Sequence, residues 1–358
     1  MKYKIENEEE DIIRSRALTI YYKNFFRDSI LKFITQRSKR IVAFQMNAHT
    51  FTRRKKYSAA ELKRILTRWM KPPLVIHLGS IARYEEDSEI TQQIKKEFII
   101  DIDINDYDTV RSCCCEKNFC TKCWILLEIA YKIICRRLAP LVKEEENILP
   151  VFSGGRGLHV IIYKRSFSKY NQTERKDLLY QIKTLKYKSE QEDEKVLEIL
   201  KDGLNRYLQQ QPIEKEPEKW KEIIRKTLMG NSDYKNEIEK FFYILNSPEL
   251  FEKRIIEKFY KYSWRRDVKN WWVLYDLARE IFAPRIDTEV TTAMWHLYKA
   301  PYSPHPRTGK IALPIPDMEK SYNPEDFPSF YDLPYHKELI DIFENSLKCF
   351  EKKIIIKK

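Results

Sequence analysis

The chain carries the stretch Glu97-Phe98-Ile99-Ile100-Asp101-Ile102-Asp103-Ile104, in which two carboxylates interrupt an apolar run. Most of its apolar residues are β-branched, so the stretch is predicted to be a strand that is buried on at least one face. Side chains alternate along a strand, which puts Asp101 and Asp103 on the same face. Ionised carboxylates so close together repel each other and lose hydration, so a cation normally accompanies them. The stretch therefore predicts a metal site, with an edge strand whose aspartates face water as the alternative.

The spacing of these aspartates suits one kind of chemistry. Alternate residues of a strand have Cα atoms roughly 6.6 Å apart, and their carboxylates can converge on ions about 3.5–4 Å apart, as in two-metal phosphoryl-transfer sites. Further along, Pro284-Arg285-Ile286-Asp287 is predicted to be a short extended segment with Arg285 and Asp287 on one side. A simple ion pair is the alternative there.

The composition is that of a folded protein with an excess of positive charge. Charged residues make up 33% and aromatic residues 13% of the 358 residues, and the net charge is +13. This balance favours a polyanionic partner such as nucleic acid or nucleotides, with a lysine-rich solvated surface as the alternative. The length allows one large domain or two of ordinary size.

Neither a membrane span nor a secretory signal is expected. No apolar run approaches the 18 residues that a transmembrane helix needs, and the first residues lack the apolar region of a signal peptide. We therefore expect an intracellular protein in a reducing environment. In such a compartment, clustered cysteines indicate metal binding rather than disulfides.

Five of the seven cysteines lie between Cys113 and Cys123. Four of them, Cys113, Cys114, Cys120 and Cys123, form a CC-x5-C-x2-C set that can close a tetrahedral structural zinc site. The alternative is a group of free thiols. Cys115 could replace Cys114 as a ligand. Because four thiolates leave no open position on the ion, the predicted role is structural.

The few glycines of the chain are concentrated in one turn. Only seven occur, and three of them lie in Ser153-Gly154-Gly155-Arg156-Gly157-Leu158-His159, between two predicted strands. Glycines let backbone N–H groups approach an anion closely, and Ser153, Arg156 and His159 can add hydrogen bonds and charge. The turn therefore predicts phosphate binding, with a purely structural hairpin as the alternative.

Two further segments are basic. Phe51 to Tyr57 is rich in arginine and lysine with aromatic ends, and a phosphate could lie along it, although an exposed basic loop explains it equally well. Lys299 to Lys310 is a second basic loop, stiffened by prolines.

Hydrophobic periodicity predicts the remaining elements. Helices are expected over residues 12–38, 58–70, 124–138 and 337–352, and strands over 40–44, 74–78, 149–152, 160–163 and 311–315. Residues 168–262 are rich in lysine and glutamate with helical spacing, so they are expected to form an inserted helical subdomain. The main core then comprises residues 1–167 and 263–358.

Taken together, these motifs resemble the small, catalytic subunit of the archaeal and eukaryotic DNA primase, and the eukaryotic branch in particular. The residues that carry the resemblance follow the family's order and are Tyr21, Tyr22, Phe25 and Phe26, Glu97 to Asp108, Cys113 to Trp124, Ser153 to His159, Pro284 to Asp287, and Lys299 to Gly309. The resemblance implies an α/β fold: a primase-type mixed-sheet catalytic core with a structural zinc motif over 113–123 and the inserted helical subdomain.

The resemblance also implies an activity and the residues for it. The family synthesises short RNA primers de novo on single-stranded DNA from ribonucleoside triphosphates. By resemblance, Asp101, Asp103 and Asp287 would hold two Mg²⁺ or Mn²⁺ ions, and the four cysteines one Zn²⁺. The incoming triphosphate would be held by Ser153, Arg156, His159, Arg285, Lys299 and His305. Arg53 would hold a nucleotide at the initiation site.

The resemblance implies partners as well: a large primase subunit and the catalytic and accessory subunits of DNA polymerase alpha, in the nucleus. The chain departs from the family pattern at Ile41, where a glutamate is usual, and at Gly155, where a second arginine is common. Two alternative functions stay open. One is a primase-polymerase that acts in DNA repair, and the other is a catalytically silent, zinc-bearing nucleic-acid-binding assembly subunit.

Overall fold

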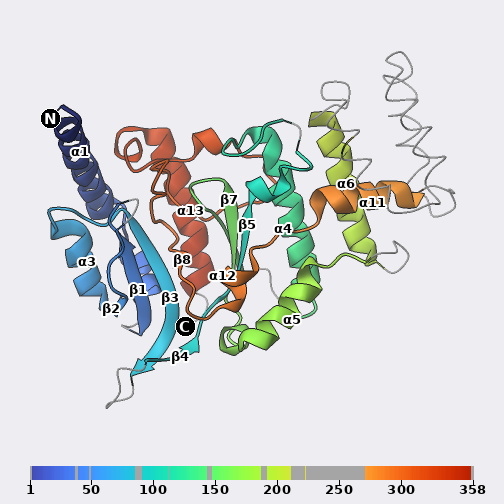
Figure 1. The fold of residues 1–358 in the computed structure, drawn as a ribbon, viewed down its shortest axis with the longest axis horizontal. Coiled ribbons are helices and arrows are strands. Elements are labelled where there is room, and N and C mark those ends of the chain that lie inside the picture. The colour runs from blue at the N-terminus through green and yellow to red at the C-terminus, as the bar shows by residue number, and fades with distance from the viewer. Residues whose placement is uncertain are drawn as a thin grey trace.

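A computed structural model describes residues 2–36, 39–47, 50–84, 91–111, 113–142, 147–186, 192–210, 222 and 271–355. Two antiparallel sheets lie side by side, with helices around them (Figure 1). Most of the second half of the predicted helical subdomain lies outside the described residues.

The first sheet holds the strands from the N-terminal part of the chain. Its order is β2 (Lys55–Lys56), β1 (Arg40–Gln45), β3 (Val75–Tyr84) and β4 (Thr91–Lys95), and β8 (Tyr298–Lys299) also pairs with β3. The second sheet has the order β5 (Phe98–Asp103), β7 (Gly157–Ile162) and β6 (Ile148–Phe152). Every ladder between these described strands is antiparallel, so the expected mixture of parallel and antiparallel pairs is not found among them.

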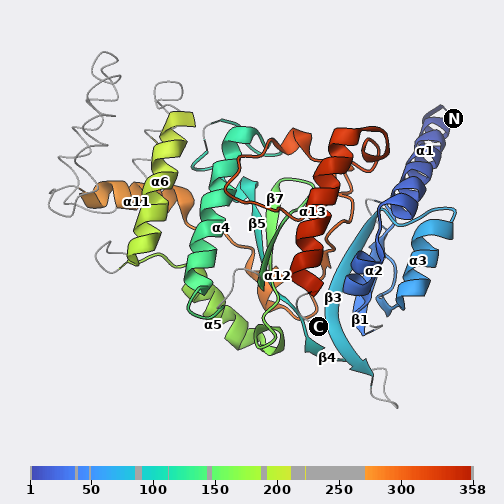
Figure 2. The ribbon, with the colours of Figure 1, turned by 180° about the vertical axis from the view of Figure 1, so that it is seen from behind.

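Helices cover both sheets (Figures 1 and 2). The α-helices are α1 (Lys2–Asn24), α2 (Asp28–Thr35), α3 (Ala59–Arg68), α4 (Trp124–Leu138), α5 (Gln172–Lys183), α6 (Glu194–Gln210), α11 (Trp271–Phe282), α12 (Thr288–Thr292) and α13 (Lys337–Ile355). Short 3-10 turns are η1 (Ile104–Tyr107), η2 (Thr121–Cys123), η4 (Phe167–Lys169), η9 (Pro324–Asp326) and η10 (Leu333–Tyr335). In both views α4 and α13 stand on either side of the three-stranded sheet.

The sequence predicted most of these helices and strands, but some predictions were wrong. Residues 311–315, which were expected to form a strand, have only isolated β-bridges, at Ile311 and Pro314. Ser58 caps α3 through a reciprocal capping box with Glu61, as its position before the helix indicated. The single helix expected over residues 12–38 is instead two helices. The chain leaves the helical path at Phe25 and Phe26, which are buried, and Arg27 is extended. Burial of these aromatic rings therefore outweighs helix continuity.

One hydrophobic core joins the sheets and helices. Phe98, Ile99, Ile100 and Ile102 of β5 are fully buried, so both faces of this strand are covered at its start. The buried side chains of α5 and α6 belong to the same apolar cluster as those of α4. The division into a core and a helical subdomain remains a proposal.

A buried ion pair ties the two sheets together. The guanidinium of Arg40 on β1 donates to both carboxylate oxygens of Glu97, which precedes β5. It also donates to the carbonyl of Gly79 on β3 at 3.2 Å. The side chains are 0% and 9% exposed, so neither charge has water as a substitute partner.

Replacing Arg40 by methionine is expected to lower the free energy of unfolding by about 3–5 kcal/mol, because Glu97 is then left buried and charged without a cation, with only the hydroxyl of Tyr298 3.4 Å away. The double variant Arg40→Met with Glu97→Gln removes that charge and should recover part of the loss. Urea unfolding of the two variants and the wild type measures both effects. A loss in the single variant no larger than that of an exposed surface change would contradict the role of the pair.

Candidate active site

The structure brings the three aspartates singled out in the sequence to one place. Asp101 and Asp103 project from β5, and the backbone of Asp287 pairs with that of Asp101, with N–H donating to the carbonyl at 3.0 Å. Asp103 and Asp287 each begin a helical turn. Their carboxylates accept from the backbone N–H of Asn105 at 3.0 Å and of Glu289 at 2.9 Å. Residues 186 positions apart in the sequence thus form one carboxylate cluster, defined as Asp101, Asp103 and Asp287.

Two buried cations fix the segment that follows Asp287. Lys96 donates to the carbonyls of Val290 and Ala293, at 2.8 and 2.9 Å, and so satisfies the end of α12. Arg175 of α5 donates to the carbonyl of Thr291 and to those of Lys96 and Glu97 before β5. These bonds hold α12 against β5 and thereby fix Asp287 relative to Asp101.

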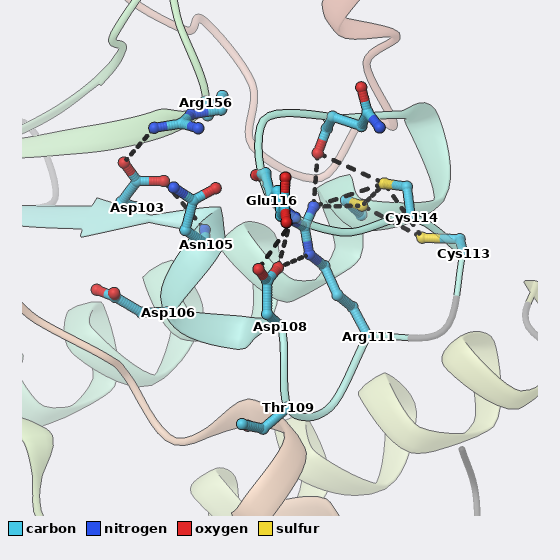
Figure 3. Close-up of polar contacts among 12 residues, drawn as sticks. Asp103, Asn105, Asp106, Asp108, Thr109, Arg111, Cys113, Cys114, Glu116 and Arg156 are labelled. Carbon is cyan, nitrogen blue, oxygen red and sulfur yellow. Dashed lines mark hydrogen bonds and ion pairs between the residues drawn. The ribbon is translucent and has the colours of Figure 1, made fainter. Parts of the chain in front are cut away.

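Basic side chains from the neighbouring strands approach the carboxylate cluster. His159 of β7 lies opposite Asp101 in the ladder, with Nε2 3.5 Å from the carboxylate. Arg156 lies 3.5 Å from the carboxylate of Asp103 (Figure 3). Lys299 of β8 donates to the carbonyl of Ser153 at 2.7 Å. Arg156, His159 and Lys299 therefore lie near the aspartates, and Ser153 is bonded to Lys299.

The glycine-rich segment is the turn between β6 and β7. The hydroxyl oxygen of Ser153 accepts from the N–H groups of Gly155 and Gly157, at 3.2 and 3.0 Å. Gly154 has a φ of +76°, which an L-residue with a side chain rarely adopts. A Cβ at Gly157 would lie 2.4 Å from the carbonyl of Ile102, so only glycine allows this turn to approach β5.

A cavity of about 250 Å³ opens beside this turn. Its lining combines the glycine-rich turn, the cysteine loop and the second basic loop, and consists of Lys117, Phe119, Gly155, Arg156, His305, Arg307, Thr308, Lys310, Pro324 and Glu325. Its lining has four cationic side chains and one carboxylate, a balance that favours an anion. Lys117, Arg307 and Lys310 were not predicted individually from the sequence, although Arg307 and Lys310 belong to the second basic loop.

The carboxylate cluster carries negative charge that a bound cation would compensate. Burial, together with the negative charges of Asp287 and Asp103, raises the pKa of Asp101 to about 7. Burial lowers the pKa of Lys299 to about 7 and that of His159 to about 3, so the imidazole is neutral at physiological pH. Hard oxygen donors with unbalanced negative charge fit Mg²⁺ or Mn²⁺.

The raised pKa of Asp101 predicts a pH dependence for binding of Mn²⁺. The folded, metal-free protein binds a proton at Asp101 more tightly than the unfolded chain does, so this group stabilises the fold at low pH. That contribution is lost as the pH rises from about 4 to about 7. A metal competes with the same proton, so the Kd for Mn²⁺ should rise about tenfold per unit of pH below about 7. Titrations with Mn²⁺ between pH 5.5 and 8 test this, and a constant Kd would contradict it.

Three predicted residues have other surroundings. Arg285 donates to the carbonyl of Asp106 at 2.6 Å and to the hydroxyl of Thr109 at 3.0 Å, so its guanidinium faces the η1 turn. The ring of His305 lines the cavity, and its Nδ1 accepts from the N–H of Thr308 at 3.3 Å. Arg53 is exposed just before β2. An additional imidazole, His77, pairs with Lys299 across β3 and β8, and burial lowers its pKa to about 4.

The cysteine loop forms a separate cluster. The Sγ atoms of Cys113, Cys114, Cys120 and Cys123 all lie within 4.8 Å of one another, with neighbouring pairs 3.2 to 3.9 Å apart. A tetrahedron of sulfurs at Zn–S distances of about 2.3 Å has edges of roughly 3.8 Å, so this set fits zinc. Cys115 is exposed and outside the group. Within the described ranges, this is the one group found with ligand atoms so close, and the three aspartates are not such a group.

The fold and the site define a class of protein: an α/β chain with a carboxylate cluster between two sheets, a basic cavity beside it and a separate thiol cluster. The DNA primase small subunit family matches residues 100–316, which is more than half of the chain. The chain belongs to the DNA primase small subunit family, as its motifs predicted.

Individual relatives agree with this assignment and with the eukaryotic branch. The DNA primase small subunit of Saccharomyces cerevisiae is 26% identical over 290 residues, which cover 71% of this chain and 66% of the yeast protein. The one from Caenorhabditis elegans is 27% identical over 250 residues, 63% of this chain and 60% of that protein. The archaeal DNA primase small subunit PriS of Pyrobaculum calidifontis is 30% identical over 174 residues, 46% of this chain and 53% of that protein.

The chain spans less than two thirds of the length of the eukaryotic relatives that it matches, between 57% and 66%. Among the residues that the structure describes, no helix has the length and apolar character needed to cross a membrane.

Proposed function

We propose that this chain is the catalytic small subunit of a DNA primase, which joins ribonucleotides de novo into short RNA primers on single-stranded DNA for replication. The observation that carries the proposal is the backbone pairing of Asp287 with Asp101, which completes a carboxylate cluster with Asp103 beside a basic cavity. A subunit that only assembles others has no need for three clustered acids at an anion site.

Asp101, Asp103 and Asp287 would hold two Mg²⁺ or Mn²⁺ ions. These ions, when bound, lower the pKa of the attacking 3′-hydroxyl and neutralise charge on the departing pyrophosphate. The raised pKa of Asp101 supports the assignment, because two divalent charges are the natural complement of three carboxylates in a partly buried site. Neither a serine nor a cysteine nucleophile is required.

The side chains of the basic cavity would bind the triphosphate. Arg156 and His305 line the cavity, and Ser153, His159 and Lys299 lie between it and the carboxylate cluster. Arg285 is also proposed to bind the triphosphate. A phosphate would have to displace its hydrogen bonds to the carbonyl of Asp106 and the hydroxyl of Thr109. Arg53 is proposed to hold a nucleotide at the initiation site.

The cysteine cluster would hold one Zn²⁺ with a structural role. We also propose that the protein acts in the nucleus with a large primase subunit and the catalytic and accessory subunits of DNA polymerase alpha. The proposals of nuclear localisation and of these partners rest on family membership alone.

Synthesis without a primer tests the function directly. The protein is incubated with single-stranded DNA and Mg²⁺ or Mn²⁺, first with ribonucleoside and then with deoxyribonucleoside triphosphates. Short products made from ribonucleotides alone support the primase. Efficient use of deoxyribonucleotides would favour a repair primase-polymerase, and no product with either set would favour the silent assembly subunit.

The glycine at position 155 sets a further expectation. A Cβ there would lie 2.7 Å from Nε2 of His305, whose ring is held by the turn at Thr308. Gly155→Arg should therefore displace His305 and raise the KM for the triphosphate, by about tenfold, with a smaller change in kcat.

The matched comparison for this variant is His305→Ala, alone and combined with Gly155→Arg. If displacement of the imidazole is the cause, adding the arginine to His305→Ala costs little. A lower KM for Gly155→Arg than for the wild type would instead mean that the added guanidinium binds phosphate without disturbing the cavity.

A further inference from the structure

A buried arginine lies between the cysteine cluster and Asp108, at the end of the η1 turn that follows Asp103. The side chain of Arg111 is 0% exposed and lies between the cysteine loop and the η1 turn (Figure 3). On one side its Nη1 is 3.5 Å from Sγ of Cys114 and 3.6 Å from Sγ of Cys123. On the other side its Nε donates to Asp108 at 2.5 Å.

The same guanidinium shapes the cysteine loop itself. It donates to the carbonyl of Asn118 at 2.6 Å and to that of Glu116 at 3.0 Å. The second oxygen of Asp108 accepts from the N–H of Glu116 at 3.0 Å. Glu116 has a φ of +51°, a conformation that costs free energy for a residue with a side chain. The Arg111–Asp108 pair thus holds both polar backbone groups of the strained residue.

The η1 turn carries this connection to the aspartates. Asp108 ends the turn, with its N–H donating to the carbonyl of Asn105, and Asp103 caps the other end through the N–H of Asn105. Arg285, two residues before Asp287, donates a hydrogen bond to the carbonyl of Asp106 in the turn. A shift of Asp108 would therefore displace the η1 turn. Backbone groups of that turn bond to the carboxylate of Asp103 and to Arg285, two residues before Asp287.

The charge of Arg111 makes the connection depend on occupation of the cysteine cluster. Four thiolates around one Zn²⁺ carry a net charge of about −2, and a buried cation beside them compensates it. The guanidinium lies 3.5 and 3.6 Å from two of the sulfurs, so its bonds to Asp108 and to the carbonyls of the loop depend on where those sulfurs are held.

We propose that Arg111 is a positioning residue that couples the two clusters, so that occupation of the cysteine cluster sets the conformation of the η1 turn and the affinity of the aspartates for divalent cations. This inference rests on the proposed metal roles of the two clusters. It gives the zinc motif an influence on the catalytic metals in addition to its effect on folding.

Hydrogen exchange of the full-length protein tests the coupling without any substrate. Arg111→Lys keeps the charge, but a single ammonium cannot reach Asp108, two carbonyls and two sulfurs together. We expect amide exchange over residues 103–110 to become at least about tenfold faster, while that of the buried helix α4 stays unchanged. The Kd for Mn²⁺ alone should rise about fivefold, in the range of measured long-range couplings.

The matched control is Arg136→Lys. Arg136 makes a two-bond contact with Asp193, at 2.9 and 2.7 Å, but lies on α4 away from both clusters. It should leave exchange over residues 103–110 and the Kd for Mn²⁺ at wild-type values. If Arg111→Lys does not fold, the comparison is made on wild-type protein before and after a chelator removes its zinc.

Faster exchange confined to the cysteine loop, with residues 103–110 and the Kd for Mn²⁺ unchanged, would overturn the inference and leave Arg111 a local support. The outcome is separable from that of the proposed function. A protein that shows the coupling but joins no nucleotides would refute the function and leave the coupling standing.

Discussion

Asp101→Asn is expected to reduce primer synthesis by at least about a hundredfold while leaving the fold intact. The amide keeps the shape of the carboxylate but cannot balance the charge of a divalent ion, and Asp101 is the member of the cluster bonded through its backbone to Asp287. Asp287→Ala should be equally damaging, because it removes a ligand of the same ions. The measurement is the rate of unprimed synthesis on single-stranded DNA.

The same variants offer an internal check on folding. Without added divalent ions, Asp101→Asn should be at least as stable as the wild type near pH 7.5, since it removes a repelled, partly buried charge. Asp177→Asn, an exposed change on α5, controls for a loss of one charge and should keep full activity. Near wild-type synthesis by Asp101→Asn would refute the assignment of the carboxylate cluster.

Cys123→Ser is expected to produce the largest loss of stability. Cys123 is fully buried directly before α4, and its Sγ lies 3.2 Å from those of both Cys113 and Cys114. Mutation of a residue that hydrogen-bonds to a metal ligand typically lowers metal affinity by roughly tenfold to hundredfold. Loss of the ligand itself should lower the zinc affinity by more than that. Because metal binding is coupled to folding, Tm should fall with the zinc content. Elemental analysis and thermal unfolding measure the two effects.

Cys115→Ser is the matched control, since it changes the neighbouring thiol in the sequence that lies exposed and outside the cluster. It should retain one zinc per chain and the wild-type Tm. If Cys115→Ser loses zinc while Cys114→Ser keeps it, then Cys115 is the fourth ligand and the set assigned from the structure is wrong. Wild-type protein without stoichiometric zinc would refute the zinc site as a whole.

Local patterns predicted the parts of the site that the chain forms over short distances. The strand with Asp101 and Asp103, the cysteine set and the turn at Ser153 each combine spacing and residue type within about a dozen residues, so their geometry follows from backbone rules. Family resemblance grouped Asp287 with Asp101 and Asp103 as metal ligands, whereas the backbone pairing that brings Asp287 next to Asp101 is seen only in the structure.

The buried cations could not be predicted in this way. Arg40, Lys96 and Arg175 read as ordinary surface charges, and their burial depends largely on partners that lie 39 to 197 residues away. Arg285 shows a related difficulty. Its position near Asp287 was predicted, but a long side chain can turn either way, and here it contacts the η1 turn.

Diffraction from crystals soaked with Mn²⁺ and a non-hydrolysable ribonucleoside triphosphate would show directly whether the three aspartates hold two ions. We expect two anomalous peaks about 3.5–4 Å apart, bound by Asp101, Asp103 and Asp287, with the triphosphate extending toward Arg156 and His305. Manganese bound only elsewhere, or a triphosphate bound with no ion at these three aspartates, would contradict it.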